Sequence, residues 1–446
     1  MINNYQSTLD YLYSFVDYSL TRNLRYSPEK FNLKRMRTLL ELIDNPDNDY
    51  PIIHVAGTKG KGSICAFLSS VLHSANLKVG LYTSPHMHDF TERIQTDGKN
   101  IPKAELVSLI EEMKPSITKV KGLSTFEITT AAAFLYFSKQ KIDIAVIEVG
   151  LGGRLDATNV VKPIISVISS ISKDHVKILG NTYEKIAIEK SGIIKNNIPV
   201  VVAPQKPRVL DKIIEIAKNH HSPIYVIDEL YRYRLSYHDL RGQSFELFRI
   251  NNSSMKYKLK IPLLGFHQIQ NAVTAYAVIE IIKRYGFDIS LFAVKRGFKK
   301  VKWPGRFEVL SEKPFIIIDS AHNLDSVIKL LKTIDEYLNN KKIILLFGVS
   351  EDKDVSGMIQ AFRSNVVRII ASKSVHPRAL DATEIIEIAK KRGIKGEAIV
   401  PIGSALRKAI HYWDENSVII ATGSIFVAAA VKEIWNGIKE HNRKSK

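Results

Sequence analysis

Short runs of β-branched residues alternate with longer amphipathic stretches along most of the chain, and this alternation constrains the fold more than any other feature. It predicts strand–helix–strand units, in which helices join parallel strands and cover the sheet. The strands expected are Pro51–Ala56, Ile142–Val149, Ile164–Ile168, Pro199–Ala203, Phe315–Asp319, Lys342–Gly348, Val366–Ala371 and Ser417–Ala421. The clearest helical stretches are Ser63–Ser74, Ser124–Ser138 and Gln268–Tyr285. We therefore expect an α/β protein with mainly parallel sheets.

The chain has 446 residues, which is too many for one ordinary core, so two domains are expected. The segment Lys299–Gly305, KKVKWPG, is basic and contains proline and glycine, and a new strand–helix alternation begins after it. We predict an N-terminal domain over residues 1–300 and a smaller, Rossmann-like α/β domain over 301–446. One segment differs, because Arg232–Ile261 alternates apolar and polar residues as antiparallel strands do.

The sharpest local motif is a glycine-rich loop between the strand IIHVA and a helical stretch. That setting is the one a phosphate-binding loop requires, because its backbone N–H groups and the helix N-terminus attract phosphate oxygens. Lys61 can reach the β- and γ-phosphates, and the Ser63 hydroxyl can bind Mg²⁺. The spacing departs from the common lysine–serine pattern, so a plain glycine turn is the alternative. The loop residues are Gly57, Thr58, Lys59, Gly60, Lys61, Gly62 and Ser63.

Glu148 ends an apolar strand, at the edge of a parallel sheet where ligands bind. A single carboxylate suits Mg²⁺, which takes few protein ligands besides phosphates and waters. The stretch GLGGRLDATN that follows suits a mobile, substrate-facing segment. His175 lies just past another strand end and could bind a metal or a carboxylate, whereas Lys190, taken alone, is one more lysine on a helix.

The composition limits the kinds of molecule that this protein is expected to bind. With 45% hydrophobic and 24% charged residues, the chain has the composition of a folded, soluble protein, and Cys65 is its one cysteine, so no cysteine metal cluster forms. A formal charge of +19 suits nucleic acid or polyanionic small molecules such as ATP. We expect small molecules, because the lysines are spread along the chain and no zinc-finger or RNA-binding signature appears. No signal peptide or membrane span is evident, and we expect a cytoplasmic protein that binds no membrane.

Together these stretches resemble the Mur ligase superfamily and, within it, the folylpolyglutamate synthases and dihydrofolate synthases. The resemblance extends over most of the chain in the family's order. It is carried by GTKGKGS, TSPHMHDFTERI, STFEITTAAAF, EVGLGGRLDATN, DHVKILGNTYEKIAIEKSGI, LLGFHQIQNA, PGRFE, DSAHN, SVHPRA and TGSIFVAA. The family's own phosphate loop also lacks the strict lysine–serine pair.

The resemblance implies a role for each matching residue. Lys61 would contact phosphate, Ser63 and Glu148 would hold one Mg²⁺, and His175 would help to hold a second. Lys190 matches the family's carbamylated lysine, and the alternative is an unmodified lysine paired with Glu189 or another carboxylate. The remaining implied contacts are to ATP from Asn271, Arg306, Asp319 and His322, and to the folate or acyl phosphate from Ser84, Phe126 and Arg154.

The implied activity is that of an ATP-dependent acid–amino-acid ligase that adds L-glutamate to a folate or to dihydropteroate through an acyl phosphate. We expect both activities in one monomeric chain, because the loop Thr83–Ile94 resembles that of bifunctional members. The C-terminal domain would be the glutamate ligase domain. Two alternatives remain: a Mur-type ligase for another acid, and, from a different class, a P-loop NTPase that depends on nucleic acid.

Overall fold

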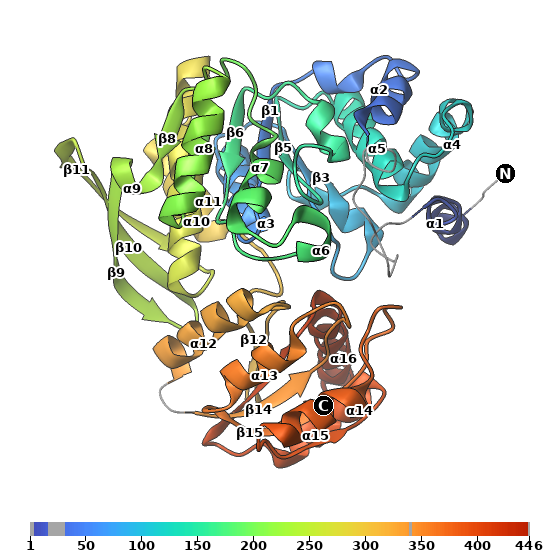
Figure 1. Cartoon of the computed structure of the whole chain (residues 1–446), viewed down its shortest axis with the longest axis vertical. Helices are drawn as coiled ribbons and strands as arrows, with labels where there is room; N and C mark the ends of the chain where they lie inside the picture. Colours follow the sequence, from blue (N-terminus) through green and yellow to red (C-terminus); the bar gives the residue numbers. More distant parts are fainter. Residues whose placement is uncertain (1–3, 17–31, 339–340, 445–446) are drawn as a thin grey trace. The chain divides into compact units, whose positions relative to one another are not determined.

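The computed structural model, which describes residues 4–16, 32–338 and 341–444, places the expected strands in two separate sheets (Figure 1). Contacts group the chain into two units. Unit 1 comprises Met1–Ser236, Ser244–Pro262 and Gln268–Val301. Unit 2 comprises Tyr237–Gln243, Leu263–His267 and Lys302–Lys446. The chain therefore passes into unit 2 for the last time after Val301, and two short earlier segments also belong to that unit.

The sheet of unit 1 has the strand order β4-β3-β2-β5-β1-β6-β7-β8. All neighbours from β2 to β8 are parallel, and β3 and β4 run antiparallel at one edge. Because β1 lies between β5 and β6, their three carboxyl ends meet at one edge of the sheet. The strands are β1 (Ile52–Ala56), β2 (Val79–Tyr82), β3 (Ile94–Thr96), β4 (Lys99–Asn100), β5 (Ile144–Glu148), β6 (Ile165–Ile168), β7 (Val200–Val202) and β8 (Ile224–Val226).

Helices cover this sheet because its central strands are apolar on both faces. Helix α5 begins at a capping box, in which the Ser124 and Glu127 side chains each accept from the other's backbone N–H. The helices that begin before residue 301 are α1 (Tyr5–Tyr13), α2 (Leu33–Glu41), α3 (Lys61–Ser74), α4 (Lys103–Lys119), α5 (Thr125–Gln140), α6 (Val176–Leu179), α7 (Tyr183–Ser191), α8 (Pro207–Asn219), α9 (Ile227–Leu230), α10 (Phe266–Ile282) and α11 (Leu291–Lys300). Single 3₁₀ turns lie at Pro46–Asn48, Phe90–Arg93, Ala157–Val160 and Lys283–Tyr285.

The alternating segment forms a small three-stranded sheet of order β11-β10-β9. Its strands are β9 (Tyr231–Asp239), β10 (Gly242–Arg249) and β11 (Asn252–Ile261). Arg234 pairs with Glu246, and the Ser236 hydroxyl donates to the Ser244 carbonyl, so β9 and β10 run in opposite directions. The expectation of antiparallel strands here is confirmed.

Unit 2 has a six-stranded sheet of order β12-β13-β17-β14-β15-β16, parallel except for β12. Its strands are β12 (Glu308–Glu312), β13 (Phe315–Ile318), β14 (Lys342–Phe347), β15 (Val366–Ala371), β16 (Gly396–Ala398) and β17 (Ser417–Thr422). Its helices are α12 (Leu324–Leu338), α13 (Val355–Phe362), α14 (Ala382–Lys391), α15 (Ile402–Tyr412) and α16 (Ile425–Lys444). A separate apolar cluster from these strands and helices forms its core.

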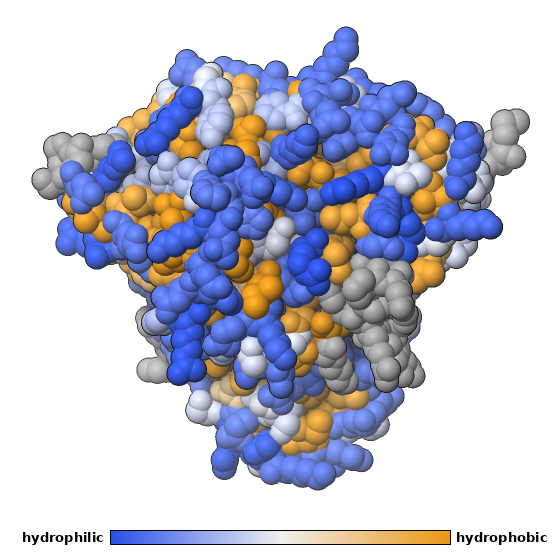
Figure 2. Space-filling view, turned by 45° about the horizontal axis from the view of Figure 1, so that its top comes forward, coloured by the Kyte–Doolittle hydropathy of each residue, from blue (hydrophilic) through white to orange (hydrophobic). Residues whose placement is uncertain are grey.

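The expected α/β class is confirmed, and each of the eight expected strands is present with small shifts at its ends. Cys65 is buried and free, as a small apolar residue behind the loop would be. Within the described part of the chain, none of the helices combines the length and apolar character that a membrane span needs. The face drawn in Figure 2 is mainly hydrophilic, and its apolar side chains form small separate patches.

Candidate active site

The loop between β1 and α3 has a backbone that only glycine adopts easily at two positions. Gly57 has φ 142° and Gly60 has φ 93°. A Cβ atom on Gly57 would lie 1.9 Å from the Ser169 Oγ, and one on Gly60 would lie 2.3 Å from the Asn271 Oδ1. The N–H groups of Thr58 and Lys59 both donate to the Ser170 carbonyl. The loop is therefore fixed against the segment after β6, in the strand–loop–helix setting that the sequence predicts.

Lys61 and Glu148 face each other across the carboxyl ends of β1 and β5. The Lys61 Nζ lies 3.8 Å from the Glu148 Oε1, and the two side chains are 16% and 6% exposed. The Glu148 Oε2 also accepts from the backbone N–H of Ser84, at 3.3 Å. Ser63 is buried in the first turn of α3. The predicted phosphate lysine and the predicted metal carboxylate thus lie together in a site of low exposure.

A second ion pair joins the loop to the segment after β6. The Lys59 Nζ lies 3.0 Å from the Asp174 Oδ2, and Asp174 is almost fully buried. The other oxygen of Asp174 accepts from the N–H of His175. His175 is the N-cap residue of α6 and has a left-handed φ of 49°. The ring of His175 is about one-third exposed and lies beside Asp174. Sequence reasoning gave Asp174 no role, although it directly precedes the predicted histidine.

Lys190 is buried in the last turn of α7, with 5% of its surface exposed. Its ammonium group donates to the Gly57 carbonyl at 2.8 Å, so the helix and the phosphate loop are joined directly. Burial lowers the pKa of Lys190 to about 7, and repulsion from Lys61 adds to this effect, while Asp174 opposes it. An amine with this pKa is half neutral near pH 7, which is unusual for lysine.

The glycine-rich loop after β5 packs against α7 and α5. The N–H of Arg154 donates to the Glu189 carbonyl, and its guanidinium binds the Glu189 carboxylate at 2.9 and 3.1 Å. A Cβ on Gly153 would lie 2.7 Å from two α7 carbonyls, and one on Gly150 would lie 2.5 Å from the Phe126 ring. The Arg154 side chain remains 46% exposed. The loop is thus held at several points, with the arginine at the surface.

The other predicted residues of unit 1 lie around the same strand ends. Ser84 reaches Glu148 through its backbone, and the ring centroid of Phe126 lies 6.1 Å from that of Tyr82. Asn271 is buried in α10 beside Gly60, and its amide donates to the Gln268 side chain. Unit 1 therefore brings together all the predicted residues that it contains.

Two predicted residues of unit 2, Asp319 and His322, follow β13, and the third, Arg306, lies just before β12; all three contact the backbone of their own loops. Asp319 accepts from the N–H groups of Phe307 and Ala321, both at 2.8 Å. The His322 ring lies 2.9 Å from the Ser320 carbonyl, and an Arg306 nitrogen donates to the Gly305 carbonyl. These residues form one cluster within unit 2.

Sequence reasoning missed a buried network behind the glycine-rich loop. Asp156 accepts from the N–H of Leu151 and from the N–H and hydroxyl of Thr158. Thr158 in turn lies 2.9 Å from the Nε2 of His54, inside β1. The pattern Asp-x-Thr before a helical turn is a capping signal that could have found Asp156, but no local pattern connects it to His54.

The residues present fit one Mg²⁺ better than two. Glu148 and Ser63 supply a buried carboxylate and a buried hydroxyl. These two groups are enough, because Mg²⁺ usually binds only one or two protein carboxylates besides phosphates and waters. Within the described residues no group of three or more His, Cys, Asp and Glu could hold a metal ion. Such a group is not needed where phosphates and waters complete the shell. As an ammonium, Lys190 offers no oxygen ligand, and it fits a second metal only after carbamylation.

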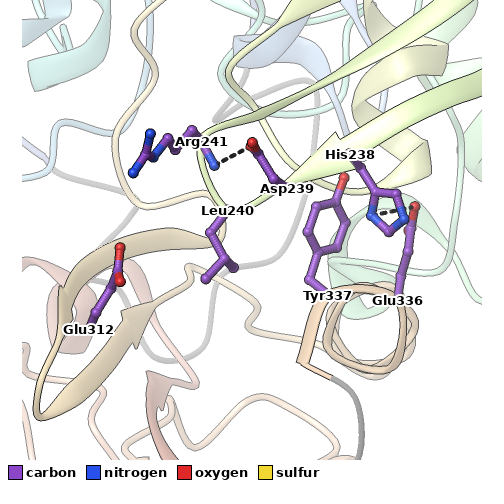
Figure 3. Close-up of a pocket in the computed structure, with 7 residues that line it drawn as sticks. All are labelled: His238, Asp239, Leu240, Arg241, Glu312, Glu336 and Tyr337. Carbon is purple, nitrogen blue, oxygen red and sulfur yellow. Dashed lines mark hydrogen bonds and ion pairs between the residues drawn. The ribbon is translucent and has the colours of Figure 1, made fainter.

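Unit 2 also contains a cavity of about 580 Å³ at the tip of the β9–β10 hairpin (Figure 3). Asp239 accepts from the N–H of Arg241, and His238 stacks edge-on against Tyr337. None of the residues predicted from the sequence lines this cavity, although all of them are described. Its lining is His238, Asp239, Leu240, Arg241, Glu312, Glu336 and Tyr337.

Comparison with known proteins gives consistent relatives for both units. Residues 55–279 match the model of the Mur ligase middle domain, and residues 305–425 match that of the Mur ligase glutamate ligase domain. A dihydrofolate synthase/folylpolyglutamate synthase of Bacillus subtilis (strain 168) is 34% identical over 94% of this chain and 99% of its own.

Solved structures give the same relatives. Escherichia coli FolC in complex with DHPP and ADP is 27% identical, with a TM-score of 0.86, over 98% of this chain and 99% of that one. A bifunctional folylpolyglutamate synthase/dihydrofolate synthase with Mn, AMPPNP and L-glutamate bound is 28% identical, with a TM-score of 0.83. That match covers 97% of this chain and 98% of the other.

Proposed function

The chain belongs to the Mur ligase family, and within it we propose that the protein uses ATP to join L-glutamate to the carboxylate of a folate or of dihydropteroate. The observation that carries this proposal is the buried charge cluster at the carboxyl ends of β1, β5 and β6. There Lys61 faces Glu148, and Lys190 is bonded to the phosphate loop. A site that transfers a phosphoryl group needs such preorganised charges more than it needs a protein nucleophile.

The proposed reaction has two steps, and each forms one bond and breaks another. A carboxylate oxygen of the acid attacks the γ-phosphorus of ATP in line, and ADP leaves, which yields an acyl phosphate. The amine of glutamate then attacks the acyl carbon, loses a proton and displaces inorganic phosphate, so that an amide forms. Lys61 begins α3, beside the loop glycines, and neutralises charge on the phosphoryl oxygens in the first step. Because water would hydrolyse the acyl phosphate, the site must exclude it.

Ser63 and Glu148 are the residues that would hold a first Mg²⁺, and His175 and a carbamylated Lys190 would serve a second. When bound, Mg²⁺ neutralises phosphate charge and orients the nucleotide. The carbamate is part of the proposal because it converts a buried cation into an anion with two oxygen ligands. The low pKa of Lys190 supports it, since carbon dioxide reacts with a neutral amine.

We assign the ATP-binding role to residues 1–300 and glutamate ligation to residues 301–446. Asn271 of unit 1 and Arg306, Asp319 and His322 of unit 2 would contact ATP together. In a structure with ATP or ADP bound, Lys61 and Asp319 should lie on opposite sides of one cleft. An Asp319 remote from the nucleotide would remove unit 2 from the proposed ATP site.

Both activities in one chain are the preferred form of the proposal. The loop Thr83–Ile94 supports it, because its sequence resembles that of bifunctional members and its backbone at Ser84 contacts Glu148 of the charge cluster. The cytoplasmic location and the monomeric state stay predictions. Only the net charge of +19 supports the alternative of a nucleic-acid-dependent NTPase. Both that charge and the arrangement of Lys61, Glu148 and Lys190 support the ligase.

One assay separates these functions: phosphate release from ATP, measured with a pteroate such as dihydropteroate, a folate, glutamate and nucleic acid added in turn. A ligase releases phosphate in step with amide formation only when an acid and glutamate are both present. Release with dihydropteroate and with a folate would establish both activities. Release stimulated by DNA or RNA alone, and reduced steeply by salt, would contradict the ligase.

A further inference from the structure

A chain of hydrogen bonds inside unit 1 joins the middle of β1 to the glycine-rich loop after β5. His54 is fully buried in β1, and its Nε2 lies 2.9 Å from the Thr158 Oγ1. The Thr158 Oγ1 lies 2.5 Å from one oxygen of Asp156. The other oxygen of Asp156 accepts from the N–H of Leu151 at 2.8 Å. His54 is three residues before Gly57, so the strand that carries the phosphate loop also reaches the glycine-rich loop.

The hydrogen bonds of this network all run in the direction of the Asp156 carboxylate. Burial raises the pKa of Asp156, whereas the hydrogen bonds that it accepts from two backbone N–H groups and one hydroxyl oppose this shift and favour the ionised form. The single hydroxyl proton of Thr158 is thereby used, so its oxygen must accept from His54. His54 therefore carries its proton on Nε2. Burial lowers the pKa of His54 to about 3, so its ring is neutral near pH 7.

Asp156 fixes a loop that is held at its other points by α7. The N–H of Arg154 donates to the Glu189 carbonyl, and the Arg154 carbonyl accepts from the Asn159 amide at 3.0 Å. The same amide donates to the Gly192 carbonyl at 2.9 Å, just past the end of α7. The exposed Arg154 side chain therefore projects from a backbone that has little freedom. Loss of the Asp156 contact would release the start of this loop at Leu151.

A histidine at position 54 is costly for packing alone. Its neighbours in β1 are Ile52, Ile53, Val55 and Ala56, all fully buried. The His54 Nδ1 is buried without a hydrogen-bond partner among the described residues, and such an orphan acceptor destabilises the fold. An apolar residue would avoid that cost, but it could not donate to the Thr158 hydroxyl as the Nε2–H of His54 does.

We propose that His54 is a positioning residue, which acts through Thr158 and Asp156 to fix the loop that presents Arg154 to the acid substrate. The inference rests on the proposed ligase function and on the implied role of Arg154. It predicts that the network acts on binding of the acid carboxylate and not on binding of ATP.

The kinetic test compares His54→Leu with His54→Gln, whose amide places a donor near the Nε2 position. His54→Leu should raise the KM for the acid about five- to tenfold, the effect of one buried hydrogen bond, and leave the KM for ATP within about twofold. His54→Gln should restore most of the loss. His73→Gln, at an exposed site on α3, should behave as wild type. Wild-type kinetics in a folded His54→Leu variant, or an equal rise in both KM values, would overturn the proposal.

A double-mutant cycle tests the route through Arg154. If His54 acts by positioning that side chain, His54→Leu should have little further effect on the acid KM in an Arg154→Ala background. Fully additive effects would contradict the route. If His54→Leu does not fold, Thr158→Val and Thr158→Ser provide the same comparison. Valine removes the hydroxyl and should raise the acid KM, whereas serine keeps it; equal kinetics in both would overturn the proposal.

The protonation of His54 gives a readout that does not depend on activity. Nitrogen-15 NMR of the whole chain, with the His54→Gln spectrum subtracted, should show a neutral ring protonated on Nε2 at pH 7. A ring protonated on Nδ1 would break the hydrogen-bond chain and the proposal with it. Failure of the wild type to ligate glutamate would instead reject the proposed function and leave this tautomer result standing.

Discussion

The two units use charged side chains in different ways. In unit 1, charged groups from different strands and helices meet at the sheet edge, where each is at most 16% exposed: Lys61 with Glu148, Lys59 with Asp174, and Lys190 with the Gly57 carbonyl. In unit 2, the carboxylate of Asp319 accepts from two backbone N–H groups of its own neighbourhood.

This difference indicates that unit 1, and not unit 2, is arranged to stabilise charge on a reacting group. Charges that meet in a site of low exposure act strongly on a reacting phosphate, because little water screens them. A carboxylate that holds its own loop chiefly fixes local geometry. Substitutions in unit 1 should therefore reduce turnover, whereas those in unit 2 should first reduce stability.

The largest effect is expected at Lys61. Lys61→Ala should lower kcat by on the order of 10²-fold or more, because it removes a preorganised contact to the phosphoryl oxygens. The KM values should change far less, since the contact matters most in the transition state. Lys212→Ala, whose partly exposed side chain pairs with Glu215 on α8, is the control. Steady-state kinetics that gave near-normal turnover for Lys61→Ala would make the loop purely structural.

Lys190 should come next. Lys190→Ala should lose roughly 10- to 100-fold in activity, the usual effect of removing a group that supports a metal site. Short-chain carboxylic acids should restore part of this by standing in for the carbamate. Lys185→Ala, exposed on the same helix, should be unaffected. Full activity of Lys190→Ala without additives would contradict the carbamate hypothesis. An unmodified amine in a well-ordered map of crystals grown with Mg²⁺ and bicarbonate would contradict it too.

The pKa of Lys190 gives this prediction a pH dependence. The pKa is lowered from 10.5 to about 7, so between these values the folded protein binds fewer protons than the unfolded chain. This group therefore makes the free energy of unfolding rise with pH across that window. The neutral amine, which carbon dioxide attacks, becomes the main form above pH 7. Incorporation of ¹³CO₂ at Lys190, followed by NMR, should increase as the pH rises through 7 and fall below it.

Asp319 tests the other side of the comparison. Asp319→Ala should lower the free energy of unfolding of unit 2 by about 1–2 kcal/mol, because the N–H groups of Phe307 and Ala321 lose a charged acceptor. Phe307 has a left-handed φ of 43°, which this contact helps to hold. Urea denaturation should show the loss, with Asp335→Ala, exposed on α12, as the control. An undiminished stability, with a fall in kcat as large as that of Lys61→Ala, would erase the contrast between the units.

The smallest effect is expected at the surface of unit 1. Glu189→Gln removes the charge that binds Arg154, whose side chain is nearly half exposed. The free energy of unfolding, measured by thermal denaturation, should change by less than about 1 kcal/mol, because water screens the exposed arginine of this pair. The acid KM should rise no more than a few-fold. A loss of turnover comparable to that of Lys61→Ala would show that this pair belongs to the buried cluster after all.

Much of the architecture could be predicted because its signals are local. The eight strands and the phosphate loop follow from β-branched runs and from glycines next to a helix start. Edge strands such as β4 and β16 were missed because they are very short and have no fully buried residue, so no apolar run marks them. The resemblance to Mur ligases supplied the roles of Lys190, Asp319 and Arg154, which their local sequence does not reveal.

By itself, the sequence determined the α/β class and the order of strands and helices along the chain, because hydrophobic period and glycine position act over a few residues. Only the tertiary structure decided which charged and polar groups meet. Lys190 reaches a carbonyl 133 positions away, and His54 reaches a hydroxyl 104 positions away. Both contacts depend on β1 lying beside β5 and β6. That order is set by packing of the whole sheet, which no local stretch encodes.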